Sequence, residues 1–568
     1  MKKSVSSRLG VGAVAVALLL TACGGGNSAS GTKGGTLYII TNAEQILHLD
    51  PQRNYTGEDL AFASGYLNRT LTQYTISKDN NEASKLVPDL ATDTGTMADG
   101  GKTWSFTIRD GVKWQDGSAV TCDDVKYGVS RTFATDVITD GPTYAISLLD
   151  IPKAADGSST YKGPYVSDTA GQAAYDKAVV CEGNKITFHL AAAASDFNYT
   201  VTLSSFAPVQ KAKDTGEKYD DAVQSNGPYM IQSYVKKSKM ILVRNPNWSA
   251  SSDSLRPAYP DKIEYDFSVP EALVTERLMQ DSGTNSSTIS PDSIDPTKLS
   301  VVFNGAQYKD RRFNEYDPYV RYYAINTKKV TNVKHRQAIM AALNREALRK
   351  IAGGKYAGDF ADGVIKPNIG QDYAATGLWD SLLGEAIPAT GNVALAKKLI
   401  ADSGEPFPNP LVFDYGKSPV ADQAAAAVVA SLARAGIVVK PNGIDPGAYY
   451  GVVLDPAKQG GMSAAGWGPD WLNASTVIPE LFTPTGGFPL SQYDDKAWVD
   501  KVKAAKAITD RGQQAKAWQD LNKEAMQLGL AVPTRFGLEQ RIVGSKIQGA
   551  YIWGPYGSWP YAVISVKQ

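Results

Sequence analysis

Residues 104–125 read WSFTIRDGVKWQDGSAVTCDDV, the most clearly patterned stretch of this chain. Its first six residues alternate apolar and polar side chains and end at Asp110-Gly111, which predicts a strand followed by a turn. Residues 112–114 predict a second short strand, which ends at Asp116-Gly117. Thr121 has the position of a helix cap, with acidic residues in the first turn after it. The stretch therefore predicts strand, turn, strand and helix in close succession.

Strand and helix patterns alternate on both sides of this stretch, which favours an α/β protein. A helix is expected between Asn392, which caps it, and Gly404, where it ends. Residues 333–354 predict a helix in two pieces, with Asn344 as the cap of the second piece. The alanine-rich residues 423–436 predict another helix, which ends at a glycine.

The N-terminal residues have the pattern of an export signal. Basic residues precede the apolar run 9–20, which is too short to span a bilayer. The run leads into Leu20-Thr-Ala-Cys23, which resembles the bacterial lipobox, so we expect cleavage before Cys23 and attachment of lipid to its thiol. The alternative is an ordinary signal peptide with an incidental cysteine.

These features divide the start of the chain into two segments. Residues 1–22 are expected to be a lipoprotein signal peptide. Residues 23–35, which are rich in glycine and have little to bury, are expected to be a flexible tether. The body is then exported and held at the outer face of the cytoplasmic membrane through the lipid on Cys23.

Size and charge limit the possible functions of the body. The whole chain has 568 residues, which favours division into several lobes. Its 58 basic and 58 acidic residues balance, so no basic field is available to bind nucleic acid. No second apolar stretch of about 18 residues follows the signal. We therefore expect an anchored protein that is not embedded in the membrane.

Two cysteines, Cys122 and Cys181, remain after Cys23 is set aside. An even pair in an exported protein favours a disulfide, because the compartment is oxidising. The alternative is two buried free thiols. A metal site is disfavoured because neither cysteine has the nearby His or Cys ligands that zinc requires.

The sequence offers few residues for catalysis. Its three histidines, His48, His189 and His335, belong to no HExxH pattern, and the last two are expected to be solvated. There is also no GxSxG elbow and no P-loop. We therefore expect neither an enzyme nor a protein with a metal ion or cofactor.

Several motifs together resemble the family 5 extracellular solute-binding proteins, the peptide, nickel and oligosaccharide receptors of ABC importers. The stretch quoted above resembles the family signature. Further motifs follow in the family's order: Leu86–Thr92, Ser225–Tyr229, Leu242–Trp248, Tyr323–Asn326, His335–Ile339, Leu343–Glu346, Gly466-Trp467, Asp470-Trp471 and Glu480–Phe482. The resemblance covers the chain from Gly34 to its C-terminus.

The resemblance implies a two-lobed α/β fold of the periplasmic-binding-protein type (type II), with an extra subdomain on lobe one. The implied segments are 36–56, 181–270 and 533–568 for lobe one, 57–180 for the extra subdomain, and 271–532 for lobe two. The chain is expected to cross between lobes near 268–270 and near 531–533. The family also implies a monomer that closes on its ligand about a hinge and delivers it to ABC permease subunits in the membrane.

Peptide is the ligand that the resemblance favours. In the resembling peptide receptors, an aspartate four residues after the glycine of a Gly-Trp pair binds the peptide's α-ammonium group, and Asp470 keeps that spacing from Gly466. The backbone of Gly466 and Gly468 is expected to extend along the peptide, and Trp467 to line a side-chain pocket. The alternative is that Trp467 packs in the core and Asp470 caps a turn.

Four further residues are weaker candidates for ligand contact. Gln45 and Ile46 lie in a loop that resembles a cleft-facing stretch of the relatives. Tyr415 and Lys417 follow residues 411–413, where relatives place polar or basic groups that meet the far end of the ligand. Lys417 is a candidate to bind a peptide carboxylate, and the alternative is that it is simply solvated.

Other functions remain open at this point. An oligosaccharide receptor uses the same lobes, although sugars offer no cation to Asp470. A nickel or haem receptor is disfavoured by the few histidines. An exported lipoprotein enzyme or sensor that kept the fold is a third class, because fold alone does not establish function. Two departures from the family pattern also concern the site: Pro469 lacks a backbone donor, and the usual Tyr-Pro-Asp-Pro continuation reads Trp471-Leu-Asn-Ala474.

Overall fold

The computed structural model describes residues 31–568, so the predicted signal peptide, Cys23 and most of the predicted tether lie outside the described residues. The last part of the tether does not match the expected free coil. Thr32 Oγ1 donates to Gln548 Oε1 at 3.0 Å. The Gly34 N–H donates to the Tyr259 carbonyl at 2.8 Å. These residues find backbone and side-chain partners on the body, which glycine content alone does not reveal.

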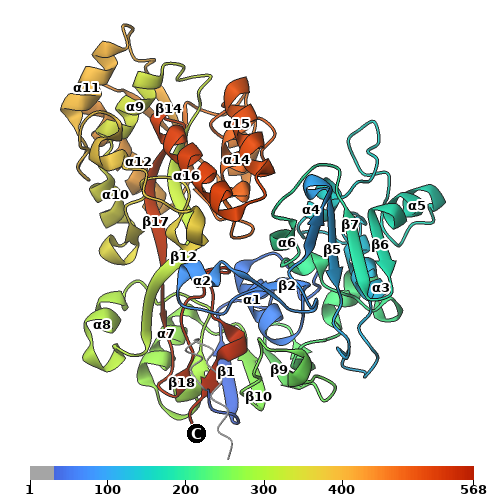
Figure 1. Cartoon of the computed structure of the whole chain (residues 1–568). Helices are drawn as coiled ribbons and strands as arrows, with labels where there is room; N and C mark the ends of the chain where they lie inside the picture. Colours follow the sequence, from blue (N-terminus) through green and yellow to red (C-terminus); the bar gives the residue numbers. More distant parts are fainter. Residues whose placement is uncertain (1–30) are drawn as a thin grey trace, which may run out of the picture. The chain divides into compact units, whose positions relative to one another are not determined.

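A five-stranded sheet, here the β1 sheet, lies near the described start of the chain (Figure 1). Its strand order is β11-β1-β10-β9-β8, and β1 runs parallel to both of its neighbours. The strands are β1 (Thr36–Ile40), β8 (Tyr229–Val235), β9 (Lys239–Arg244), β10 (Lys262–Asp266) and β11 (Thr288–Ile289). Leu37, Ile39 and Ile263 are completely buried, so alternate residues of these strands supply the core.

The position of β11 differs from the predicted lobe boundary at residue 271. The sequence predicts residues 271–532 in lobe two, yet β11 pairs with β1 of the predicted lobe one. Helix α7 (Glu271–Gln280) also buries Val274 and Leu278 in a core that includes Ile40. The sequence predicts a crossing between lobes near Pro270, whereas the structure has Pro270 at the cap of α7, since proline is well tolerated where a helix begins.

A six-stranded sheet, here the β12 sheet, has the strand order β13-β17-β12-β16-β14-β15. Its strands are β12 (Arg312–Ile325), β13 (Gly358–Asp359), β14 (Leu411–Gly416), β15 (Val439–Ile444), β16 (Met462–Trp467) and β17 (Ala531–Ile542). The long strands β12 and β17 pair antiparallel from Arg312 opposite Ile542 to Ala324 opposite Ala531. Their register shifts between Tyr316 and Val320. Figure 1 shows α9 (Val333–Ala342) to α12 (Pro419–Ala433) on one side of this sheet and α14 (Ile478–Phe482) to α16 (Arg511–Gln527) on the other.

A four-stranded sheet, here the β5 sheet, contains the stretch 104–125 in part. Its order is β4-β5-β7-β6, formed by β4 (Thr96–Ala98), β5 (Thr103–Thr107), β6 (Val179–Glu182) and β7 (Lys185–His189). The predicted first strand and helix are confirmed as β5 and α3 (Cys122–Arg131). Thr121 Oγ1 accepts from the Asp124 N–H, and Asp124 Oδ2 accepts from the Thr121 N–H. The predicted second strand reduces to one bridge between Lys113 and Ala119.

Two small sheets and the remaining α-helices are also present in the described part of the chain. The two-stranded sheets pair β2 (Thr72–Tyr74) with β3 (Leu86–Pro88) and β18 (Ile547–Gln548) with β19 (Ser565–Val566). Besides α3 and α7, the α-helices of the described residues are α1 (Gly57–Tyr66), α2 (Asn80–Ala83), α4 (Tyr144–Leu148), α5 (Thr169–Ala178), α6 (Phe197–Thr200), α8 (Leu299–Asn304), α9 (Val333–Ala342), α10 (Arg345–Ile351), α11 (Val393–Asp402), α12 (Pro419–Ala433), α13 (Tyr449–Val453), α14 (Ile478–Phe482), α15 (Lys496–Ala507) and α16 (Arg511–Gln527). Within 31–568, none of the helices combines the length and apolar character that a bilayer crossing needs.

The helix caps read from the sequence are confirmed. Asn392 Oδ1 accepts from the Leu395 N–H at the start of α11, and Asn344 Oδ1 caps α10 in the same way. Helix α12 starts earlier than predicted, because Ser418 caps it and Pro419 opens its first turn. The prediction of a solvated His335 is wrong: the side chain is 2% exposed, and its Nε2 lies 2.8 Å from Ser403 Oγ.

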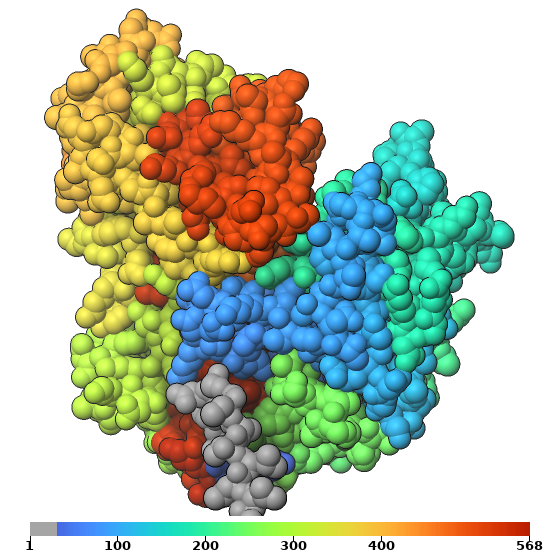
Figure 2. All heavy atoms as spheres, viewed as in Figure 1, coloured from blue at the N-terminus to red at the C-terminus, as the bar shows by residue number. Residues whose placement is uncertain are grey.

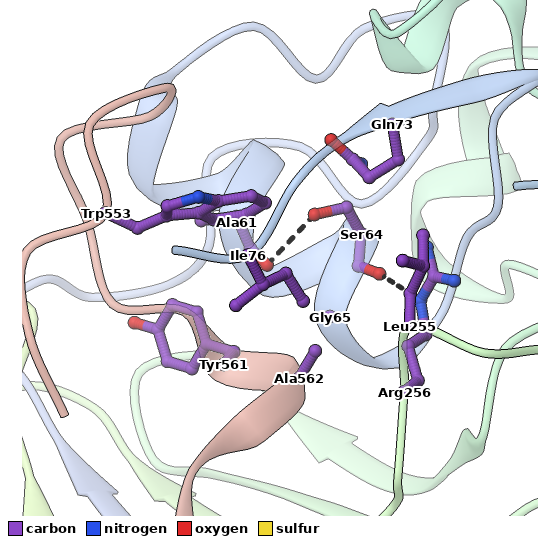
Figure 3. Close-up of a pocket in the computed structure, with 10 residues that line it drawn as sticks. All are labelled: Ala61, Ser64, Gly65, Gln73, Ile76, Leu255, Arg256, Trp553, Tyr561 and Ala562. Atoms are coloured by element: carbon purple, nitrogen blue, oxygen red, sulfur yellow. Dashed lines mark hydrogen bonds between the residues drawn. The ribbon is translucent and has the colours of Figure 1, made fainter. Parts of the chain in front are cut away.

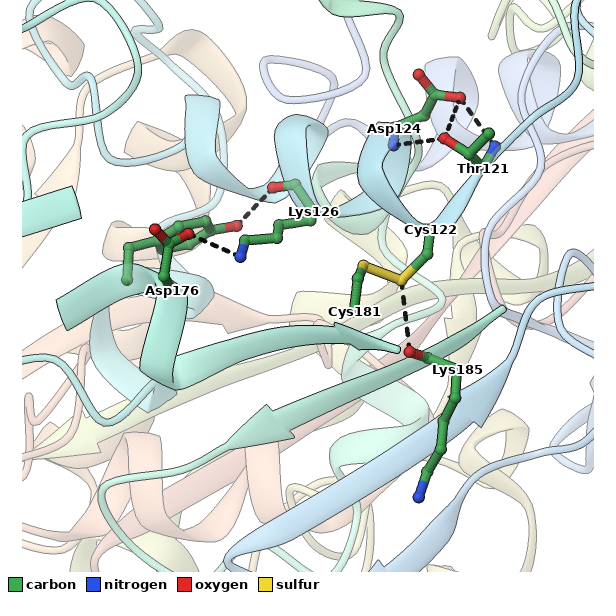
Figure 4. The surroundings of a disulfide bond; sticks show 8 residues. Thr121, Cys122, Asp124, Lys126, Asp176, Cys181 and Lys185 are labelled. Atoms are coloured by element: carbon green, nitrogen blue, oxygen red, sulfur yellow. Dashed lines mark hydrogen bonds and ion pairs between the residues drawn. A yellow bond between two sulfur atoms is a disulfide. The ribbon is translucent and has the colours of Figure 1, made fainter. Parts of the chain in front are cut away.

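The structure joins Cys122, at the start of α3, to Cys181 in β6 by a disulfide (Figure 4). The two Cα atoms are 5.9 Å apart. The segment that the bridge encloses includes α4 and α5. The bridge therefore connects a helix to the β5 sheet across a long stretch of mostly irregular chain.

A buried ion pair ties α3 to the loop that follows β1. Arg131 binds both carboxylate oxygens of Asp50, at 2.7 and 2.6 Å. Both side chains are 0% exposed. Burial raises the pKa of Asp50, although the Arg131 guanidinium opposes this shift. Arg131 Nε also lies 3.2 Å from Asp214 Oδ2, so the cation is shared by two carboxylates.

We expect the double variant Cys122→Ser/Cys181→Ser to lose about 4 kcal/mol of unfolding free energy, because the bridge no longer restricts a loop of roughly 60 residues in the unfolded chain. Denaturant titration measures the loss. A reductant should destabilise the natural protein by a similar amount and leave the double variant unchanged. Equal stability of the two proteins under oxidising conditions would contradict the assigned role.

Arg131→Met should destabilise the protein by about 3–5 kcal/mol, because the Asp50 carboxylate then stays buried without its cation. The double variant Asp50→Asn/Arg131→Met removes that stranded charge and should recover part of the loss. Chemical denaturation of both variants at neutral pH compares them directly. Asp214 also loses this cation in both variants, so a double variant as unstable as the single one would show that the stranded Asp50 charge is not the cause of the loss.

Candidate ligand-binding site

Strand β16 leaves part of one edge unpaired. It pairs with β12 along its length, but its pairing with β14 stops at Ser463 opposite Asp414. Residues 464–467 therefore have no strand on the β14 side among the described residues. The Ala464 carbonyl accepts from the Tyr449 hydroxyl at 2.6 Å. An edge of this kind can accept an added extended chain.

Asp470 lies three residues beyond the end of β16. Its carboxylate accepts hydrogen bonds from the hydroxyls of Tyr55, just before α1, and Tyr144, the first residue of α4. No Lys, Arg or His within residues 31–568 forms an ion pair with it. Burial raises the pKa of Asp470, and the two tyrosine hydrogen bonds only partly oppose the shift. The site thus contains a desolvated carboxylate with hydroxyl donors but without a cation.

The residues that follow Asp470 fix its position. The Trp471 ring meets Tyr144 edge to face at 4.8 Å between centroids, and its Nε1 donates to Asp196 Oδ2 at 2.8 Å. The Leu472 N–H donates to the Tyr74 hydroxyl at 3.1 Å. Segments expected in lobe one and in the extra subdomain therefore hold a loop of lobe two.

Further contacts beside the Asp470 loop join α15 and α16 to the segment around Ser195. Gln514 of α16 donates to Ser195 Oγ at 2.8 Å, and Ser195 Oγ donates to the Lys506 carbonyl at 3.0 Å. Figure 2 shows orange-red atoms of α15 and α16 against blue and teal atoms on the visible face. The Asp470 loop thus lies in a region where distant parts of the sequence meet.

The other residues of the Gly466–Asp470 motif have defined surroundings. Trp467 Nε1 donates to the Thr476 carbonyl at 2.7 Å, and the ring stacks on Phe488 while remaining partly exposed. A Cβ built at Gly466 would lie 2.7 Å from Nη1 of Arg321. A Cβ at Gly468 would lie 3.1 Å from the Tyr319 ring. The two glycines therefore make room for side chains of β12, a reason that the sequence alone does not give.

Within residues 31–568, no hydrogen bond or ion pair connects Asp470 to any of the four weaker candidates. The structure differs from the prediction for Ile46, whose side chain is 5% exposed and packs in the main core. Gln45 is partly exposed and Lys417 is exposed. The Tyr415 hydroxyl donates to Asp422 Oδ1 at 2.8 Å.

The structure contains a pocket of about 290 Å³ that Ala464 and Ala465 of β16 help to line. Its walls come from β12, β16, β17, α10 and α12, and they include Arg321, Arg345, Arg349 and Arg535. Sequence reasoning missed these arginines, as it missed Tyr55 and Tyr144. No local signal marks Arg321 and Arg535, because they come together only through the pairing of β12 with β17.

Two further cavities lie elsewhere among residues 31–568. The cavity in Figure 3, between α1 and the C-terminal segment near Trp553 and Tyr561, has a volume of about 10 Å³, room for at most one water. A pocket of about 340 Å³ lies beside Lys78, Glu315 and Asp359. In the described part of the chain, no group of three or more His, Cys, Asp or Glu side chains is arranged to hold a metal ion.

Comparison with known proteins gives a family match over residues 85–489, to the model described as bacterial extracellular solute-binding proteins, family 5 Middle. The oligopeptide-binding protein OppA of Bacillus subtilis is 30% identical, over only 41% of each chain. The periplasmic oligopeptide-binding protein OppA of Salmonella typhimurium is 24% identical over 79% of each chain.

Solved structures share the fold over nearly the whole chain. The clavulanic acid biosynthesis oligopeptide binding protein 2 superposes with a TM-score of 0.83 at 25% identity, covering 94% of this chain and 96% of that one. OppA of Haemophilus influenzae in complex with the peptide RPPGFSPFR gives a TM-score of 0.63 at 17% identity, covering 95% of this chain and all of that one.

These matches confirm the predicted fold class, a two-lobed α/β fold of the periplasmic-binding type. They also confirm the family that the motifs indicated, since the family model spans most of the chain. The chain belongs to the bacterial extracellular solute-binding proteins of family 5.

Proposed function

We propose that this protein is the lipid-anchored substrate-binding receptor of an ABC importer and that it captures peptides between its two lobes. The observation that carries the proposal is Asp470, a desolvated carboxylate that has no cationic partner among residues 31–568. Relatives named as oligopeptide-binding proteins, and a solved relative that holds a nonapeptide, support the ligand class.

A peptide α-ammonium group supplies what the Asp470 site lacks. A charge-assisted hydrogen bond to a carboxylate is shorter and stronger than a neutral one, and the gain is largest where water is excluded. Tyr55 and Tyr144 can keep one hydrogen bond each to Asp470 while the ammonium occupies the remaining lone pairs, because a carboxylate accepts about four bonds. A neutral sugar offers no such charge.

The unpaired edge of β16 suits the backbone of an extended peptide. Main-chain hydrogen bonds to residues 464–467 would hold peptides of different sequence equally, which is how added strands bind at sheet edges. Trp467, which is partly exposed, would contact a ligand side chain near the ammonium end. Gly466 and Gly468 would keep the edge accessible to the ligand backbone.

Closure about a hinge completes the proposed cycle. Tyr55 and Tyr144 reach Asp470 from segments assigned to lobe one and the extra subdomain, so these contacts would tighten or loosen as the lobes move. Since residues 271–311 pack with the β1 sheet, we place the crossings within β12 and β17, close to the register shift after Tyr316. The closed form would be the one that a membrane permease recognises.

The anchor and the oligomeric state are part of the same proposal. Lipid on Cys23 would hold a monomeric receptor at the outer face of the cytoplasmic membrane and raise its effective concentration near the permease. No catalytic step is required of the protein.

Asp470→Asn should weaken peptide binding by about 2–5 kcal/mol, because the ammonium group then faces a neutral amide in a desolvated site. Ligand that co-purifies with the protein is released by denaturation, identified by mass spectrometry and titrated back by calorimetry. Asp494→Asn, an exposed aspartate of the same lobe, is the matched control and should bind normally. Release of sugars, or unchanged peptide affinity in Asp470→Asn, would contradict the proposal.

Peptide affinity should fall on acidification from a higher pH than an exposed aspartate would require. Binding of the ammonium needs an ionised Asp470, and the raised pKa of this carboxyl means that it takes up a proton earlier as the pH falls. Dissociation constants measured between about pH 4 and pH 7 test this. Asp470→Asn should lack this decrease, and an identical pH profile in both proteins would assign the titration to another group.

A further inference from the structure

Asp196 is a buried carboxylate to which the proposed function gives no role. Its side chain is 2% exposed. The residue stands just before α6, and its carbonyl accepts from the Tyr199 N–H at 2.9 Å. An aspartate at such a position usually caps its own helix. Asp196 makes no side-chain cap hydrogen bond, so its carboxylate is free to bind another part of the chain.

The carboxylate of Asp196 binds the loop that follows Asp470. Its Oδ2 accepts from Trp471 Nε1 at 2.8 Å and from the Ser475 hydroxyl. The two donors stand at the two ends of residues 471–475. One carboxylate oxygen therefore holds both the start and the end of this loop.

These hydrogen bonds have no cation beside them to share the charge. No Lys, Arg or His within residues 31–568 forms an ion pair with Asp196, and Arg511 pairs with Asp372 instead. A buried carboxylate is costly unless donors satisfy it, and hydrogen bonds to a charged acceptor are stronger than neutral ones. Trp471 and Ser475 are thus held by an acceptor stronger than a neutral side chain.

The loop itself is compact, so a hold at its ends is transmitted along it. The Asn473 N–H donates to the Trp471 carbonyl at 2.7 Å. Asn473 Oδ1 accepts from the Ser475 N–H at 2.9 Å. All residues from 471 to 476 are buried. Since Asp470 is joined directly to Trp471, a shift of Trp471 moves the backbone that carries the Asp470 carboxylate.

Trp471 also supports one of the donors to Asp470. Its ring meets the Tyr144 ring edge to face at 4.8 Å between centroids, and the Tyr144 hydroxyl donates to Asp470. Asp196 fixes the indole through its N–H, and the indole in turn fixes the Tyr144 ring. Asp196 is therefore linked to Asp470 by two routes, one through the backbone and one through Tyr144.

We propose that Asp196 is a positioning residue which, through Trp471 and Ser475, places the Asp470 carboxylate where it binds the α-ammonium group of a peptide. The inference rests on the proposed function, since it takes that ammonium to be the partner of Asp470. Asp196 itself is buried away from the ligand, and its whole effect on binding depends on Asp470. A charge-assisted hydrogen bond weakens when its geometry is disturbed.

Two peptides of one sequence test the inference, one with a free N-terminus and one with an acetylated N-terminus. Both are titrated onto the full chain by calorimetry, in competition with the co-purified ligand where binding is weak. Asp196→Ala should weaken binding of the free peptide at least about tenfold. Binding of the acetylated peptide should change by no more than about twofold, because that peptide has no ammonium group to lose.

Asp196→Asn keeps a carbonyl oxygen for Trp471 and should retain most of the affinity for the free peptide. Trp471→Phe removes the donor but keeps a ring beside Tyr144, and it should show the same selective loss as Asp196→Ala. The two changes together should cost less than their sum, because both remove one hydrogen bond. Circular dichroism verifies folding, and Trp471→Phe replaces Asp196→Ala if the latter does not fold.

Asp168→Ala is the matched control. Asp168 Oδ1 accepts from the Ala170 N–H at the start of α5, so this variant also removes a carboxylate that stands before a helix. It should bind both peptides as the natural protein does.

The outcomes separate this inference from the proposed function. If Asp196→Ala and Trp471→Phe weaken both peptides equally, or leave the free peptide unaffected, the inference is overturned and the peptide receptor stands. If the natural protein binds both peptides equally, or binds neither, Asp470 is not the partner of an ammonium group, and the proposed site falls together with the inference. A loss confined to the free peptide supports the inference.

Discussion

The antiparallel pairing of β12 with β17 is the constraint on which the rest of this structure depends. β17 carries the chain from the β12 sheet back to the core shared with α7, where Ile542 packs. β12 in turn aligns β16, and β16 ends just before Asp470. Two ladders of backbone hydrogen bonds, both on β12, thus set the register of Arg321 against Arg535 and against Gly466. A slip of one residue would turn every side chain of a strand to the opposite face and dismantle the site.

The Asp470 carboxylate is electrostatically incomplete. It is partly buried and accepts from two tyrosine hydroxyls, without a cation among residues 31–568. This arrangement costs stability in the free protein, because the charge has lost water without gaining a counter-ion. Other buried charges are paired within the protein, as between Arg131 and Asp50.

What could be predicted from sequence depended on how local the cause was. The strand and helix of residues 104–125 and the cap of α11 rest on neighbours a few positions apart, and both are present in the structure. The spacing from Gly466 to Asp470 is local in the same sense. Tyr144 was missed because its role requires a partner from the far end of the chain. The lobe boundary failed for a similar reason: only the pairing of β11 with β1 reveals where residues 271–311 pack.

The two tyrosine hydroxyls on Asp470 bear on how such a receptor unloads its cargo. A partly buried carboxylate that loses a bound ammonium needs other hydrogen-bond donors to replace the lost bond, or release of the ligand is slow. Tyr55 and Tyr144 are already in contact with Asp470 and come from segments far from it in the sequence. Their hydroxyls can solvate the carboxylate as the ligand departs, so tight capture need not mean slow delivery. The pair would set the residence time of the ligand more than its affinity.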